Sequence, residues 1–231
     1  RLAQLIDGIA DIEGVEWIRL HYAYPADFPM DILDVMARRP NVCKYLDIAL
    51  QHSSDKMLKA MRRHISAADT EKLLDEIRRR VPGIRIRTTL MVGFPGEDEE
   101  DFDNLMEFVR RQRFDRMGAF AYSEEEDTYA AKHYSDDVPD GVKKRRLDSL
   151  MVLQENIAAE LSQEMVGKRL RLLVDEREGE YAVCRSEWDS PEVDLTFYVR
   201  CDAGPGEFIE ATVTRAEEFD LFADIDANTD N

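Results

Sequence analysis

Three short polar clusters could carry chemistry, because each comes directly after an apolar run that predicts a β-strand. They are Gln51-His52-Ser53-Ser54, Gly93-Phe94-Pro95-Gly96-Glu97 and Tyr122-Ser123. The carboxyl ends of the strands form the functional face of (β/α) barrels. Amide, imidazole and hydroxyl groups gathered at such a face could bind a polar ligand. Their shared placement predicts a binding rim more strongly than any one of the clusters does.

The turn Gly93–Glu97 has two glycines that permit close backbone approach or a positive φ, and Pro95 that stiffens the bend. It is not a phosphate-binding loop, because no Gly-Lys-Ser/Thr follows. A tight strand-to-helix turn without a ligand is the alternative. Two interpretations are also open for His52. It could bind a ligand, or it could cap the next helix, which is the safer interpretation.

Arg85 and Arg87 alternate with Ile84 and Ile86, so both guanidinium groups are expected on one side of a strand. If that side is a barrel lumen, one of them could hold the carboxylate of a small ligand. A salt bridge to Asp47 on a neighbouring strand is an equal alternative. The acidic run 124–127 is either a solvated loop or an attractor for a cationic substrate segment.

The three cysteines, Cys43, Cys184 and Cys201, lie far apart and form no Cys-x-x-Cys spacing. We therefore expect no metal site and three buried thiols of a reduced cytosolic protein. The formal net charge of −18 argues against broad binding to phosphate backbones and suits a basic protein partner. Because the sequence has neither a signal peptide nor a membrane-spanning run, we expect a soluble, cytoplasmic chain.

Apolar runs with strand character alternate with helical patterns from residue 15 to about 122, which predicts an α/β fold with parallel strands. We expect residues 1–135 to form part of a (β/α) barrel that begins in mid-domain, and residues 136–165 to form a bridging helix behind Pro139. Short alternating runs then predict a small antiparallel β-barrel over 166–226, followed by a disordered tail at 227–231.

Two stretches, Tyr45–Asp55 and Arg87–Glu97, resemble the later strands of a radical-SAM methylthiotransferase barrel. Two more, Phe114–Ala131 and Arg185–Asp194, resemble the RimO branch of that family. The resemblance implies an enzyme that methylthiolates the β-carbon of an aspartate in the small-subunit ribosomal protein numbered twelve. It also implies S-adenosylmethionine, two 4Fe-4S clusters and a terminal TRAM domain, which is an OB-like barrel.

By the same resemblance, Gln51, His52 and Ser53 would lie near the nucleoside or methionine part of the cofactor. Gly93 would lie near the adenine, and Arg87 is a weaker candidate for the cofactor carboxylate. No residue is assigned a catalytic role, and the cluster ligands of the family have no match here, so this chain alone should be inactive.

The resemblance leaves two alternatives open. A tRNA methylthiotransferase shares the barrel but predicts a basic terminal domain, whereas residues 166–231 contain seven Lys or Arg against seventeen Asp or Glu, a net charge of −10. RNA binding by this domain is therefore not expected. The other alternative is a non-catalytic acidic unit that docks the basic ribosomal protein.

Overall fold

The computed structural model describes residues 1–217 and 219–225 of the chain. The chain divides into two compact units, one from Arg1 to Gln154 and one that begins at Glu155. The tail predicted at 227–231 lies outside the described residues.

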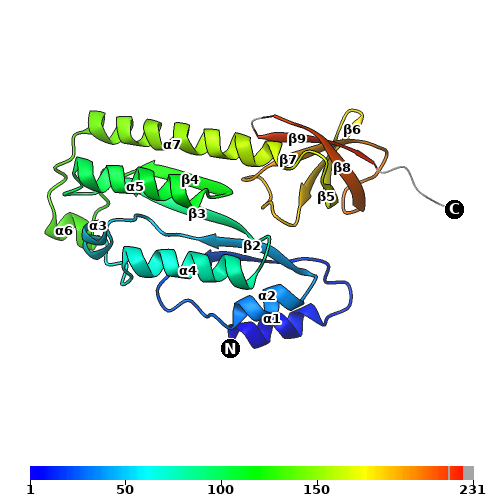
Figure 1. Ribbon diagram of the computed structural model, residues 1–231, viewed down its shortest axis with the longest axis horizontal. Coiled ribbons are helices and arrows are strands. Elements are labelled where there is room, and N and C mark those ends of the chain that lie inside the picture. Colours follow the sequence, from blue (N-terminus) through cyan, green and yellow to red (C-terminus); the bar gives the residue numbers. More distant parts are fainter. Residues whose placement is uncertain (218, 226–231) are drawn as a thin grey trace. The chain divides into compact units, whose positions relative to one another are not determined.

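The first unit is built on a parallel sheet of four strands in the order β1-β2-β3-β4 (Figure 1). The strands are β1 (Ile18–Ala23), β2 (Val42–Ile48), β3 (Arg85–Val92) and β4 (Arg116–Ala121). The helices are α1 (Leu2–Ala10), α2 (Ile32–Arg38), α3 (Asp55–Ala60), α4 (Ala67–Arg80), α5 (Glu99–Gln112), α6 (Tyr129–His133) and α7 (Asp140–Gln163), the last of which continues into the second unit. Neighbouring strands of a parallel sheet need crossover connections, which the intervening helices supply. The predicted α/β architecture is confirmed.

The two faces of the sheet differ in burial. Along β3 buried residues alternate with partly exposed ones, so Arg85 and Arg87 lie on one face and Ile86 and Thr88 on the other. The apolar face forms part of the core, in which β2 and α5 contribute fully buried side chains. This alternation confirms that the two arginines share a side of the strand.

Three helices begin at residues that the sequence marks as caps. The Ser54 hydroxyl accepts a hydrogen bond from the Met57 N–H at the start of α3, and Ser66 accepts one from the Asp69 N–H at the start of α4. Asp98 and Asp101 form a reciprocal capping box at the start of α5. Each such cap contributes about 1 kcal/mol. Two of these helices, α3 and α5, therefore start at fixed points just after the polar clusters.

The second unit is a closed five-stranded barrel with the order β5-β6-β7-β9-β8. Its strands are β5 (Arg169–Glu178), β6 (Tyr181–Ser186), β7 (Thr196–Arg200), β8 (Phe208–Ala216) and β9 (Asp220–Ile225). The prediction of a wholly antiparallel barrel is wrong in one detail, because β7 pairs with β9 in parallel. Closure leaves β5 paired with both β6 and β8, so the barrel has no free sheet edge.

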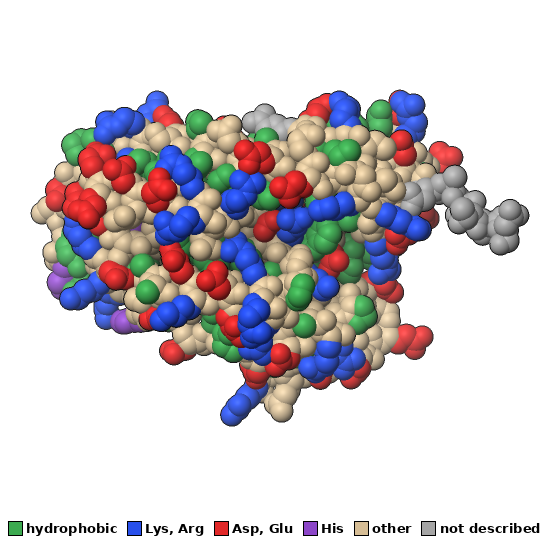
Figure 2. Space-filling model, viewed as in Figure 1, with side chains coloured by type: hydrophobic (Ala, Val, Ile, Leu, Met, Phe, Trp, Pro, Cys, Tyr) green, Lys and Arg blue, Asp and Glu red, His purple; other side chains and the backbone are tan. Residues whose placement is uncertain are grey.

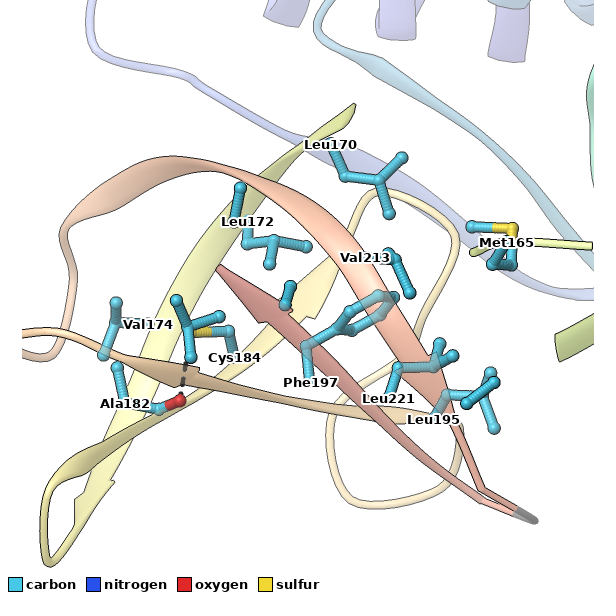
Figure 3. Packing of buried hydrophobic residues seen from close by; sticks show 14 residues of the cluster. Met165, Leu170, Leu172, Val174, Ala182, Cys184, Leu195, Phe197, Val213 and Leu221 are labelled. Carbon is cyan, nitrogen blue, oxygen red and sulfur yellow. Dashed lines mark hydrogen bonds between the residues drawn. The ribbon is translucent and has the colours of Figure 1, made fainter. Parts of the chain in front are cut away.

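Inward-facing side chains fill the barrel (Figure 3). Leu172 and Val174 of β5, Phe197 of β7 and Leu221 of β9 are almost completely buried. They alternate with more exposed residues along each strand, as the period of two in the sequence predicts.

On the face that Figure 2 shows, Lys and Arg side chains lie among Asp and Glu side chains. Arginine side chains of the first unit form ion pairs with aspartates, for example Arg39 with Asp7 and Arg80 with Asp34. Among the described residues, no helix has both the length and the apolar character that crossing a membrane requires.

Candidate functional site

The carboxyl ends of β2, β3 and β4 bring the predicted polar clusters to one edge of the sheet. Gln51 continues the pairing beyond β2: its N–H donates to the Thr89 carbonyl at 2.9 Å, and its carbonyl accepts from the Met91 N–H at 2.8 Å. Its φ is 72°, a region that costs a non-glycine residue roughly 1 kcal/mol or more. The pairing with β3 holds Gln51 in this conformation at the rim.

His52 is completely buried directly after Gln51. Its Nδ1 accepts hydrogen bonds from the N–H groups of Ser53 and Ser54 at 2.9 and 3.0 Å. A neutral imidazole that accepts at Nδ1 carries its proton on Nε2, and this atom lies 3.5 Å from Oε2 of Glu97. His52 therefore organises the chain before α3 and contacts the turn after β3. The interpretation of His52 as the cap of the next helix is wrong, because Ser54 is the residue that caps α3.

Glu97 is the centre of a buried polar network. Its Oε2 accepts a hydrogen bond from the Gly93 N–H at 2.8 Å, and its Oε1 pairs with Arg146 of α7 at 2.8 Å. Arg146 also pairs with Glu99 at 3.0 Å. Because the Glu97 and Arg146 side chains are only 0% and 4% exposed, loss of either partner would leave a buried charge with less compensation. The network ties α7 to the Gly93–Glu97 turn.

Gly93 is explained by its conformation and by its neighbour. Its φ is +73°, and a Cβ at this position would lie 2.4 Å from Cγ of Lys143. Lys143 is itself buried, is paired with Asp136 and lies 5.3 Å from the centre of the Tyr122 ring. The glycine therefore admits a lysine side chain from α7, a contact that the sequence did not predict. A role for Gly93 near an adenine ring stays a prediction.

A cavity of about 330 Å³ opens at the same edge of the sheet. The side chains that matter for its chemistry are Gln51, Met61, Arg62, Met91, Phe94 and Tyr129. Within the described part of the chain, the buried Oε1 of Gln51 has no hydrogen-bond partner. The guanidinium of Arg62 lies over the Tyr129 ring at 4.6 Å. An apolar, aromatic cavity with one unsatisfied amide oxygen can accept a planar ring and an N–H donor.

Of the predicted site residues, only Gln51 lines this cavity; His52, Ser53, Gly93 and Arg87 do not. Sequence reasoning missed Arg62 and Tyr129. Arg62 has a φ of 58°, which no local motif announces. Tyr129 follows the exposed acidic run 124–127, and no local motif marks it as a site residue.

The two arginines of β3 have different surroundings. Arg85 forms an ion pair with Asp115 at 2.5 Å, and the same carboxylate accepts a hydrogen bond from the Ile86 N–H. Arg87 lies in register with Asp47 of β2 and with Arg116 of β4. The sequence correctly placed Asp47 on the neighbouring strand beside this arginine, but it did not identify Asp115.

The cysteines do not form a thiolate set. Cys43 lies in the first unit, whereas Cys184 and Cys201 lie in the second, and all three are free. Burial raises the pKa of the Cys184 thiol to about 12. Cys201 is only partly buried, so the expectation that all three are buried is wrong for this residue. No group of three or more His, Cys, Asp or Glu in the described ranges could hold a metal ion.

Comparison with known proteins defines the class. Residues 1–109 match the model of the radical SAM superfamily, and residues 166–225 match that of the TRAM domain. Among solved structures, *Escherichia coli* coproporphyrinogen III oxidase (HemN), a radical SAM enzyme, is similar with a TM-score of 0.52 and 19% identity over 69% of this chain and 36% of its own. That likeness concerns the fold alone. The chain thus combines a radical-SAM region with a TRAM domain.

Sequence relatives narrow the class to one family. Proteins described as ribosomal protein uS12 methylthiotransferase RimO are 56% identical in *Phocaeicola vulgatus* and 58% identical in *Bacteroides thetaiotaomicron*, each over 97% of this chain and 53% or 52% of the relative. The one from *Flavobacterium johnsoniae* is 50% identical over 96% of this chain and 52% of its own. Over 96–97% of its length the chain is similar to RimO-type radical-SAM methylthiotransferases, and it spans about half the length of the curated relatives it matches.

Proposed function

We propose that the full-length protein methylthiolates an aspartate side chain of ribosomal protein uS12 by a radical-SAM mechanism. The observation that carries this proposal is the identity of 50–58% with proteins named for that activity, over 96–97% of this chain. The charge of the second unit supports the choice of substrate. Its net charge of −10 from residue 166 onward suits a basic ribosomal protein better than tRNA. A reaction on ribosomal protein also favours the cytoplasm.

S-adenosylmethionine fits the rim of the sheet. When bound, it supplies the methyl group and the radical chemistry. The buried Oε1 of Gln51 would accept an N–H of the cofactor and so gain the partner that it lacks among the described residues. His52 and Gly93 would act as positioning residues, because their polar atoms face Ser53, Ser54 and Glu97.

Ser53 and Arg87 complete the proposed contacts. Ser53 Oγ is buried without a hydrogen-bond partner in the described part of the chain, next to the fixed Gln51 backbone. Arg87 lies on the more exposed face of β3 and would attract the cofactor carboxylate.

The iron–sulfur clusters do not fit the residues of this chain. A 4Fe-4S cluster is held by thiolates, and the three cysteines are divided between the two units. We therefore infer that the two clusters of the full-length protein have ligands outside these residues. This chain alone would act as a scaffold and docking half of the enzyme.

The test is anaerobic reconstitution of the full-length protein and of this chain with iron and sulfide. It is followed by assays for cleavage of S-adenosylmethionine and for methylthio transfer to uS12. We expect iron binding and turnover from the full-length protein only. Cluster binding by this chain alone would contradict our assignment of the cysteines, and transfer to tRNA instead of uS12 would favour the tRNA-modifying alternative.

A further inference from the structure

A row of aromatic rings crosses the outer face of the second unit. Tyr181 of β6, Tyr198 of β7 and Phe222 of β9 come from three neighbouring strands and are partly exposed. The Tyr198 and Phe222 rings stack at 5.5 Å, and the Tyr181 and Tyr198 rings meet edge to face at 6.2 Å. We call these three residues the aromatic row.

Strand register sets acidic residues beside this row. Glu176 pairs with Val183, Val183 with Tyr198, and Tyr198 with Phe222, so one line across the barrel leads from a carboxylate to the rings. Asp220 is in register with Thr196, two residues before Tyr198. The pKa of the Tyr198 hydroxyl is raised by burial and by the charges of Asp220, Glu178 and Glu176. Aromatic faces and negative charge thus coincide.

The line of Glu176 and Val183 also borders a cavity of about 420 Å³. Four acidic residues line this cavity: Asp175, Glu176, Glu192 and Asp194. Asp175 pairs with Arg185 at 3.0 Å, and Asp194 accepts the Ser190 N–H at 2.8 Å. Glu176 and Glu192 form no ion pair among the described residues, so their charges are available to an incoming cation.

The rings at the ends of the row already carry guanidinium groups of this chain. Arg215 lies 3.7 Å from the centre of the Phe222 ring, and Arg200 lies 5.5 Å from that of Tyr181. A cation over an aromatic face gains about 0.5–2 kcal/mol. The geometry of the row is therefore suited to guanidinium stacking.

We propose that the aromatic row and the adjoining acidic cavity bind an arginine- or lysine-bearing segment of a basic protein. The rings take the cation by stacking, and Glu176 and Glu192 neutralise its charge. Single-stranded RNA could also stack on such rings, but the net charge of −10 beyond residue 165 repels a phosphate backbone. The identification of the basic protein as uS12 rests on the function proposed above.

The test uses this chain and a fluorescent peptide of alternating Arg and Gly, with the dissociation constant measured by fluorescence anisotropy at low and at physiological salt. Tyr198→Leu and Phe222→Leu should each weaken binding about 5-fold, since they remove the π face. Glu176→Gln should weaken binding and reduce its salt dependence. Tyr198→Phe keeps the ring and should keep the affinity, which separates stacking from misfolding.

The matched control is Phe208→Leu. Phe208 also lies under an arginine, with Arg171 at 3.8 Å, but it belongs neither to the aromatic row nor to the acidic cavity. Unchanged affinity in both Tyr198→Leu and Glu176→Gln would overturn the proposal. The proposal would also be overturned if oligouridylate bound more tightly than the peptide and Tyr198→Leu abolished the binding of oligouridylate. The surface would then be a binding site for RNA.

Failure of the surface and failure of the substrate assignment give different results. Peptide binding requires neither a cluster nor S-adenosylmethionine, whereas turnover requires both. If Tyr198-dependent peptide binding persists while the full-length protein leaves uS12 unmodified, the surface stands and the substrate assignment fails. If uS12 is modified with the same KM by wild type and Tyr198→Leu, the surface assignment fails and the function stands.

Discussion

Gly93→Ala tests whether the rim turn is shaped by its contact with α7. The φ of +73° costs an alanine about 1–2 kcal/mol. The added Cβ would lie 2.4 Å from Lys143 Cγ, and overpacking of this kind costs about 1–3 kcal/mol. Together these effects predict a loss of about 2–5 kcal/mol in the free energy of unfolding of the first unit.

Gly96→Ala is the matched control. Gly96 has a φ of +80°, and nothing lies within 4 Å of a Cβ at that position. It should therefore show only the conformational cost of about 1–2 kcal/mol. The free energy of unfolding is measured by urea titration, with tryptophan fluorescence as the signal. A Trp188→Phe background leaves Trp17 as the one tryptophan of the sequence, so the signal reports on the first unit.

A double-mutant cycle isolates the contact. Lys143→Ala removes Cγ and leaves Cβ, which would lie 3.1 Å from the added Cβ, so Gly93→Ala should cost less in that background than in the wild type. If Gly93→Ala and Gly96→Ala cost the same in the wild-type background, or if Lys143→Ala fails to reduce the cost, the contact with α7 does not explain the glycine.

Three further outcomes are expected. Glu97→Gln should destabilise the first unit by about 3 kcal/mol, because it leaves the Arg146 charge buried with less compensation, whereas the exposed Glu100→Gln should change little in the same urea assay. The Lys56 ammonium and the Asp101 N–H lower the pKa of Asp98 from 3.8 to about 2. The ionised Asp98 therefore contributes fully to the free energy of unfolding above pH 3.8, and this contribution is lost as the pH falls through about 2. The difference in urea midpoint between the wild type and Asp98→Asn should narrow over that pH window. In thiol titration with a disulfide reagent at pH 8, Cys201 should react first and the buried Cys184, with its pKa of about 12, should lag; equal rates would contradict its burial.

Local sequence signals predicted much of the fold. The alternation of Arg85 and Arg87 with Ile84 and Ile86 predicted the two faces of β3, and serines or aspartates stand at the starts of α3, α4 and α5. These features depend on residues within one turn or one strand, where steric and hydrogen-bonding rules act directly. Gln51, which the sequence placed among the polar clusters at the carboxyl ends of the strands, belongs to this group and lines the cavity.

Contacts between distant residues could not be predicted in the same way. Gly93 meets Lys143, Glu97 meets Arg146, and Arg85 meets Asp115, each across a long separation in the sequence. The parallel pairing of β7 with β9 depends likewise on how the barrel closes, since each strand alone has the same alternating pattern in either direction. Such pairings follow from the whole fold and leave no mark in a short window.

The internal contacts of His52 and Gly93 change the interpretation of the polar clusters at the rim of the sheet. His52 and Gly93 looked like ligand residues, but the Nδ1 of His52 and the amide of Gly93 have partners within the protein. Gln51 lines the cavity and its backbone forms two hydrogen bonds with β3, while its buried amide oxygen has no hydrogen-bond partner among the described residues. Most polar groups of such a motif can therefore hold the backbone in place, while one residue of the motif lines the cavity. Substitution of His52 should consequently act through the position of Gln51 and not through direct contact with the cofactor.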